Sequence, residues 1–169
     1  MVENKGDEKL CQKGCDKLLC LLGVGVMKKN KDSVSKAKKR TWAVFSKFIR
    51  MRDCLLSTKM IDWGKCFTCG KEFSIKNLQA GHFIQGRHNA ILFNEGNCHA
   101  QCYRCNVLLH GALVDYTIRM VDKYGITKVT ELKVLDKQIK QFTIPELDAL
   151  KDYYIEKIKK LEWKGVNRE

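Results

Sequence analysis

The sequence of 169 residues contains a single proline, few aromatic residues and no long apolar run. One proline and 9% aromatic residues exclude a collagen-like or low-complexity chain, and 44% hydrophobic residues suffice for a buried core. No stretch approaches the roughly 18 to 20 apolar residues that cross a bilayer, so no membrane contact is expected. Residues 18–27 are apolar but lack the flanks of a secretory signal, and a cytoplasmic location is therefore expected.

Acidic side chains are also scarce, since 32 Lys and Arg residues face 19 Asp and Glu residues, which gives a net charge of +13. Residues 28–52 hold ten of the basic residues and a single acid, Asp32. Charges that only keep a protein soluble are spread over its surface, so this concentration favours a nucleic-acid-binding arm over a solvated face. The candidate DNA contacts of the whole chain are Lys47, Arg50, Arg52, Arg87 and Arg104.

The spacing of apolar residues divides the chain into parts. Residues 28–60 are predicted to form a basic helical arm with an apolar stripe that packs on a core: Trp42, Phe45, Phe48 and Ile49. Residues 61–125 carry short strand-like runs between glycines and then a helical pattern, which predicts one small core domain. Residues 126–169 are predicted to form further helices, the last of which begins with a capping box of Thr143 and Glu146.

Cysteine is plentiful, with nine residues, and four of them form two pairs of the spacing Cys-x2-Cys, at Cys66 and Cys69 and at Cys102 and Cys105. Four thiolates complete the tetrahedral shell of a zinc ion and leave no open position, so a structural zinc is predicted. A redox dithiol and an iron–sulfur cluster are the alternatives. Three more cysteines lie in residues 1–27: Cys11, Cys15 and Cys20. They are either thiols without a metal or a second metal site.

Residues suited to phosphodiester hydrolysis lie between and beside the cysteine pairs. A neutral imidazole deprotonates water near its pKa of about 6.5, and a divalent ion stabilises charge on the phosphate. The order of His82, Asn97 and Asn106 matches the His–Asn–His/Asn arrangement of nucleases. Asn106 and His110 are four residues apart, so on a helix they would share a face and approach one ion. His99 is expected to make a structural hydrogen bond.

Four stretches carry a more specific pattern: Phe45-Ser-Lys-Phe-Ile-Arg-Met-Arg-Asp53, Cys66-Phe-Thr-Cys69-Gly, Gln79-Ala-Gly-His82-Phe and Phe93-Asn-Glu-Gly-Asn97-Cys-His-Ala-Gln-Cys102-Tyr-Arg-Cys105-Asn106. Together they closely resemble the NinG/Rap family of phage and prophage recombination nucleases, which act on branched DNA. The resemblance runs from about residue 40 to 125 and is weaker in the helices that follow.

The resemblance implies an α+β fold in which a small zinc-stabilised ββα-metal (HNH-like) nuclease core is flanked by helices. It implies that His82 is the general base, that Asn97 orients the active-site loop or the imidazole, and that Asn106 binds catalytic Mg²⁺ or Mn²⁺. His110 is a further candidate ligand. Gly81 departs from the wider superfamily, in which many members carry a metal-binding Asp or His before the base. The candidates for a carboxylate ligand are Asp53, Asp62, Glu72, Glu95 and Asp115.

The implied function is metal-dependent hydrolysis of branched recombination intermediates, such as Holliday junctions and D-loops, in the cytoplasm of a bacterial host. A homodimer is expected, because a junction is resolved by paired incisions. Two alternatives stay open. One is a non-catalytic zinc-containing module that binds nucleic acid and has no use for His82. The other is a scaffold protein whose cysteines sense the redox state.

Overall fold

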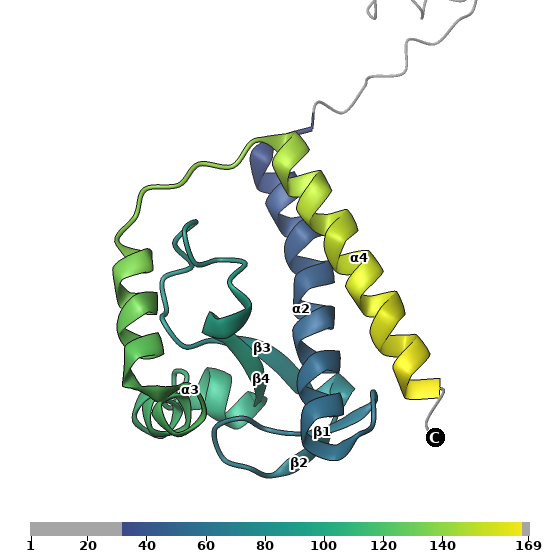
Figure 1. Cartoon of the computed structure of the whole chain (residues 1–169), viewed down its shortest axis with the longest axis vertical. Helices are drawn as coiled ribbons and strands as arrows, with labels where there is room; N and C mark the ends of the chain where they lie inside the picture. The colour runs from purple at the N-terminus through teal and green to yellow at the C-terminus, as the bar shows by residue number, and fades with distance from the viewer. Residues whose placement is uncertain (1–31, 167–169) are drawn as a thin grey trace, which may run out of the picture. The chain divides into compact units, whose positions relative to one another are not determined.

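The computed structural model describes residues 32–166, so the cysteines predicted in segment 1–27 lie outside the described residues. Over residues 32–166 the fold is mixed α+β, as the sequence predicts, with three long helices and two small sheets (Figure 1). Its helices and strands are α2 Val34–Thr58, β1 Trp63–Lys65, β2 Glu72–Ser74, β3 Leu78–His82, β4 Cys98–Cys102, α3 Leu113–Asp136 and α4 Ile144–Val166. Single helical turns lie at η1 Ile75–Asn77, η2 Glu95–Asn97 and η3 Arg104–Leu108. Within residues 32–166, no helix is long and apolar enough to cross a membrane.

Helix α2 forms the centre of the core rather than a free arm. It begins at the N-cap Ser33, whose hydroxyl accepts a hydrogen bond from the backbone N–H of Lys36. Three residues of its predicted stripe are buried, Phe45, Phe48 and Ile49, and Trp42 is half-buried. The ring of Phe45 packs edge-on against Tyr154 of α4 at a centroid distance of 4.9 Å. Helices α2 and α4 therefore lie side by side (Figure 1), and the basic residues of α2 occupy only its remaining faces.

Two antiparallel hairpins lie against α2. Strand β1 pairs with β2, and β3 pairs with β4 in a register that sets His82 opposite Cys98 and Gly81 opposite His99. All five residues of β4 are buried, since this strand lies between β3 and the chain that carries the first cysteine pair. The backbone N–H of Phe67 donates to the carbonyl of Ala100 at 2.7 Å and so attaches that chain to β4.

The helical pattern after β4 is interrupted twice. The segment η3 is a short π-helix, and left-handed backbone at His110, Gly111 and Ala112 separates it from α3. Within α3, Gly125 has φ 78° and ψ 162°, which divides the helix into two halves set at an angle (Figure 1). The capping box before α4 is confirmed, because Glu146 accepts the backbone N–H of Thr143 at 2.7 Å.

The charged residue that ties α2 to the second hairpin is Asp53. Its Oδ2 accepts the backbone N–H of Ala100 at 2.7 Å, and its Oδ1 accepts from the guanidinium of Arg52 at 2.8 Å. Arg52 also donates to the carbonyls of Glu95 and Cys98. In Arg52, one of the predicted DNA contacts, all three guanidinium nitrogens therefore bind inside the protein, and only 16% of the side chain is exposed.

Removing this buried carboxylate is expected to destabilise the fold. Asp53→Ala leaves the Arg52 guanidinium buried without its counter-charge, so the free energy of unfolding is expected to fall by about 3 to 5 kcal/mol. Urea denaturation followed by circular dichroism measures it. The matched control is Asp32→Ala, which breaks an exposed ion pair with Arg40 and is expected to change stability little. Equal losses in both variants would contradict this role for Asp53.

Candidate functional site

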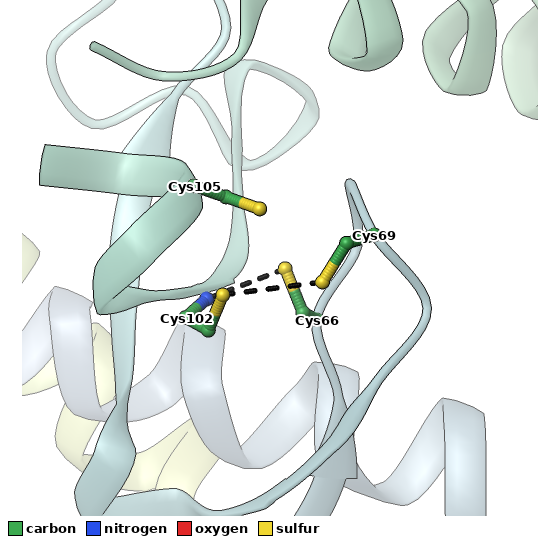
Figure 2. A group of neighbouring side chains, drawn as sticks. All are labelled: Cys66, Cys69, Cys102 and Cys105. Carbon is green, nitrogen blue, oxygen red and sulfur yellow. Dashed lines mark hydrogen bonds between the residues drawn. The ribbon is translucent and has the colours of Figure 1, made fainter. Parts of the chain in front are cut away.

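Four cysteines from two separate parts of the chain form one cluster (Figure 2). Cys66 and Cys69 lie on the loop between β1 and β2, Cys102 ends β4, and Cys105 lies on η3. Their four sulfur atoms all lie within 4.8 Å of one another, with Cys69 Sγ 3.9 Å from Cys102 Sγ. Sulfurs bound to one tetrahedral ion at about 2.3 Å lie about 3.8 Å apart. The cluster can therefore hold a single metal ion, and it offers no open position for chemistry.

The cluster is preorganised by the backbone around it. The backbone N–H of Cys102 donates to Cys66 Sγ at 3.3 Å, and the backbone N–H of Gly70 closes a tight turn on the carbonyl of Cys66 at 2.9 Å. Burial raises the pKa of the Cys66 and Cys105 thiols. A metal ion must displace these protons, so metal binding is coupled to proton release and to folding.

His82 ends β3 with its ring in a fixed position. The imidazole stacks on the indole of Trp42 at a centroid distance of 4.9 Å and an interplanar angle of 18°. Its Nε2 lies 3.0 Å from the carbonyl oxygen of Leu92. Burial lowers the pKa of His82, and the positive charge of Arg87 lowers it further, against the opposing effect of the Leu92 hydrogen bond. The imidazole is therefore neutral at pH 7.

Asn97 holds the backbone that follows His82. Its side-chain Oδ1 accepts the backbone N–H of Ile84 at 2.8 Å, and its backbone carbonyl oxygen accepts the backbone N–H of Phe83 at 2.8 Å. Asn94 instead caps the turn η2 through the N–H groups of Gly96 and Asn97. The side chain of Asn97 is thus placed to fix the loop after His82, while that of Asn94 serves a local turn.

An open groove of about 570 Å³ lies beside His82. Its charged and polar lining comprises Ser46, Arg50, Lys76, Gln79, His82, Arg87 and Asn106. A second hollow shares Lys76 and Gln79 with the groove and adds Tyr103 and Arg104. Basic side chains from four parts of the chain therefore line these two adjoining hollows beside the imidazole. Arg50, Lys76, Arg87 and Arg104 are referred to below as the basic track.

The predicted DNA contacts divide between this track and other surfaces. Arg50, Arg87 and Arg104 lie on the track, and the Arg87 guanidinium lies 4.6 Å from the centre of the Trp42 ring. Lys47 faces α4, where its ammonium group is paired with Glu162 at 3.1 Å.

Asn106 and His110 do not share a helix face. Asn106 lines the groove, and its Nδ2 donates to Gln79 Oε1 at 2.7 Å. His110 is exposed, has φ 46° and lies beyond the end of η3, so the helical spacing on which its prediction depended is absent.

His99 makes the predicted structural hydrogen bonds. Its two ring nitrogens lie 3.0 Å from the Tyr116 hydroxyl and 2.8 Å from the Tyr124 hydroxyl. Burial lowers its pKa to about 2, so the ring is neutral in the folded protein. Tyr116 in turn donates to the carbonyl of Gly81, and the network thereby links α3 to the residue before His82.

None of the five candidate carboxylates lines the groove: Asp53, Asp62, Glu72, Glu95 and Asp115. Asp53 is bound inside the protein, and Glu95 and Glu72 are paired with Lys157 and Lys65. The lining of the groove, as far as the described residues form it, therefore offers only neutral and positive groups.

The sequence did not predict several residues of the groove, among them Trp42, Lys76 and Gln79. Trp42 was expected only as a core residue, but its ring is half-buried and lies against both His82 and Arg87. Lys76 and Gln79 were not singled out. The alternation of β3 carries a signal for Gln79, since a polar side chain there stands between the apolar Leu78 and Ala80.

The cysteine cluster predicts a difference of one metal ion between two variants. Cys69→Ser removes one thiolate and is expected to lose the ion, whereas Cys54→Ala removes a buried thiol outside the cluster and is expected to keep it. Elemental analysis of the purified proteins measures the metal content per chain. The difference between wild type and Cys69→Ser excludes any ion that Cys11, Cys15 and Cys20 contribute. Equal metal content in wild type and Cys69→Ser would overturn the assignment.

Comparison with known proteins places the sequence among phage proteins. Residues 25–164 match the family NinG, described as Bacteriophage Lambda NinG protein. Protein ninG of Salmonella phage P22 and protein ninG of Escherichia phage lambda are each 33% identical to the chain over 115 residues, and that of Escherichia phage 933W is 31% identical. Each alignment covers 68% of this chain and 52% of the relative.

The chain thus spans about half the length of the curated relatives it matches. No solved structure gives a significant match. Because the family match covers most of the sequence, including all four clustered cysteines, His82 and Asn106, the chain belongs to the NinG family.

Proposed function

We propose that the chain is a metal-dependent, structure-specific endonuclease that hydrolyses branched DNA, with an HNH-like core held by a structural zinc at the four cysteines. The observation that carries the proposal is the position of the His82 imidazole, which Trp42 and Leu92 fix at the wall of a basic groove. The resemblance of the motif residues to recombination nucleases supports branched DNA as the substrate.

The hydrogen bond of His82 determines which nitrogen acts as the base. The carbonyl of Leu92 can only accept, so Nε2 carries the proton and Nδ1 keeps its lone pair. Nδ1 takes a proton from a water molecule, and the resulting hydroxide attacks the phosphorus while the 3′ or 5′ oxygen departs. Asn97 keeps the loop after His82 in place during this step through its bond to Ile84.

The basic track supplies the binding surface for the phosphates. Arg50, Lys76 and Arg87 surround the groove beside His82, and Arg104 extends the same track. A divalent ion, when bound, would supply positive charge to the phosphate and the leaving oxygen. Asn106 would hold it through an amide oxygen, an oxygen ligand of the kind that Mg²⁺ and Mn²⁺ prefer.

A homodimer is part of this proposal, because the resolution of a junction requires two incisions. Exposed apolar side chains on and after η3 suit such contacts, among them Leu108, Val114 and Ile118.

A non-catalytic module that binds nucleic acid is the second candidate. The absence of a carboxylate from the described lining of the groove favours it, because catalytic Mg²⁺ is usually held by at least one carboxylate. Such a module would keep the cysteine cluster and the basic track.

Cleavage of a labelled four-way junction in Mg²⁺ separates the two candidates. His82→Ala is expected to lower the cleavage rate by about 10²- to 10⁴-fold, because it removes the general base, and to leave junction binding nearly unchanged. The control His88→Ala removes an exposed histidine paired with Asp136 and is expected to cleave normally. If metal-loaded wild type binds the junction and does not cut it in Mg²⁺ or Mn²⁺, the binding module is correct.

The pH profile of cleavage is expected to reflect the lowered pKa of His82. The neutral imidazole is the active form, so the rate falls as the pH drops through this pKa, which lies below the ordinary value of about 6.5. Arg87→Gln removes a nearby positive charge and is expected to shift this acid limb to higher pH. Cleavage rates of wild type and Arg87→Gln are measured from pH 5 to 8, and the metal content is checked at each pH. A shift of the acid limb to lower pH in Arg87→Gln would contradict His82 as the general base.

The salt dependence of junction binding is expected to distinguish the basic track from other basic surfaces. Arg104→Gln removes one phosphate contact, so the slope of log K against log salt concentration becomes shallower by about 0.7 to 0.9. Lys47→Gln removes an equal charge on the α4 side, where Glu162 already pairs with it, and is expected to leave the slope unchanged. Titrations by fluorescence anisotropy at several salt concentrations provide the slopes. The opposite ranking would place the DNA along α2 and α4.

A further inference from the structure

Gln101, in the middle of the buried strand β4, has an amide oxygen with no partner. The residue is fully buried, and its Oε1 is the only buried side-chain nitrogen or oxygen among the described residues that lacks a hydrogen bond. Its Nε2 donates to Thr68 Oγ1 at 2.5 Å and to the carbonyl of Gly111 at 3.0 Å. Because a carbonyl accepts only, Gly111 fixes which end of the amide is the nitrogen. The orphaned atom is therefore a carbonyl-type oxygen.

This oxygen faces the residue before His82. A Cβ atom added to Gly81 would lie 1.9 Å from Gln101 Oε1 and 2.8 Å from Asn106 Oδ1. Two amide oxygens, one from β4 and one from η3, are thus directed at the space that a side chain at position 81 would fill. The orientation of Asn106 is consistent with this, since its Nδ2 is engaged with Gln79.

We propose that Gln101 Oε1 and Asn106 Oδ1 are the protein ligands of the divalent ion, and that Gln101 supplies from the opposite strand the oxygen that residue 81 does not. This inference rests on the proposed nuclease function. Mg²⁺ and Mn²⁺ accept amide oxygens as ligands, and an unpaired buried oxygen is retained at a cost to stability that ligation would remove.

The charge of these ligands has a consequence for the order of binding. Both amides are neutral, so the ion lacks the carboxylate that normally holds Mg²⁺ in the absence of substrate. Water and the phosphate of the DNA would supply its other ligands, and the phosphate would carry the negative charge. Ion and junction therefore bind with positive coupling, each raising the affinity for the other by the same factor.

Binding of Mn²⁺, measured by electron paramagnetic resonance of the free ion, tests the proposal without any cleavage. The zinc-type cysteine site is occupied beforehand, and the His82→Ala background keeps the junction intact. Gln101→Glu places a negative charge on the same oxygen and is expected to tighten Mn²⁺ binding at least ten-fold in the absence of DNA. The control Gln138→Glu adds the same charge at an exposed position near the end of α3 and is expected to change the affinity by less than two-fold.

A pair of variants tests the geometry in a second way. Gly81→Asp alone would force its Cβ onto Gln101 Oε1, whereas Gly81→Asp combined with Gln101→Ala opens that space and provides a carboxylate instead. The double variant is expected to fold with its full metal content at the cysteines and to bind Mn²⁺ at least ten-fold more tightly than wild type. If Gln101→Glu fails to fold, the double variant still tests the proposed metal site.

Unchanged Mn²⁺ affinity in a folded Gln101→Glu protein, or in the folded double variant, would overturn the proposal and leave Gln101 as a packing residue.

The coupling between ion and junction is tested by adding the junction at fixed Mn²⁺ concentration. At least a five-fold gain in Mn²⁺ affinity is expected in protein that keeps Gln101. No gain would overturn the coupling. These readouts are independent of catalysis, so a metal site at Gln101 in a protein that never cuts DNA would refute the proposed function and not the site.

Discussion

The cysteine cluster is the constraint on which the geometry of the candidate site depends. It joins the loop between β1 and β2 to the end of β4 and to η3, and the loop lies more than 30 residues before these two segments in the sequence. Strand β4 sets the register of β3, whose last residue is His82, and η3 carries Asn106 to the same groove. Weakening the cluster would therefore displace the His82 imidazole and the Asn106 amide together.

Helix α2 shows how one element serves both the core and the groove. Its buried face packs against α4 through Phe45. Trp42, one turn earlier, lies at the groove, where its ring stacks on the His82 imidazole and contacts the Arg87 guanidinium. The same helix anchors β4 through Asp53. Of the three predicted DNA contacts on α2, Arg50 lines the groove, Arg52 binds inside the protein and Lys47 faces α4.

Local sequence patterns predicted local features well. The spacing of Cys66, Cys69, Cys102 and Cys105 predicted their convergence, because a four-thiolate set has few other uses, and Thr143 with Glu146 predicted the start of α4. The prediction that Asn106 and His110 share a helix face was wrong, because η3 ends at Leu108 and left-handed backbone begins at His110. Helical periodicity in the sequence does not reveal such a break. Gln101 was unpredictable from spacing, since its importance depends on the register that sets β4 against Gly81.

The packing of α2 against α4 affects the order in which parts of the protein fold during synthesis. Phe45 and Tyr154 are more than 100 residues apart, so the first described helix leaves the ribosome long before the helix that covers it. The hairpins that the cysteine cluster joins can form earlier, because all four cysteines precede α3. Until α4 is synthesised, the part of the apolar face of α2 that α4 covers stays open to water and to other nascent chains. Assembly of the core is thus a late, long-range event, for which a chaperone that shields α2 would be of most use.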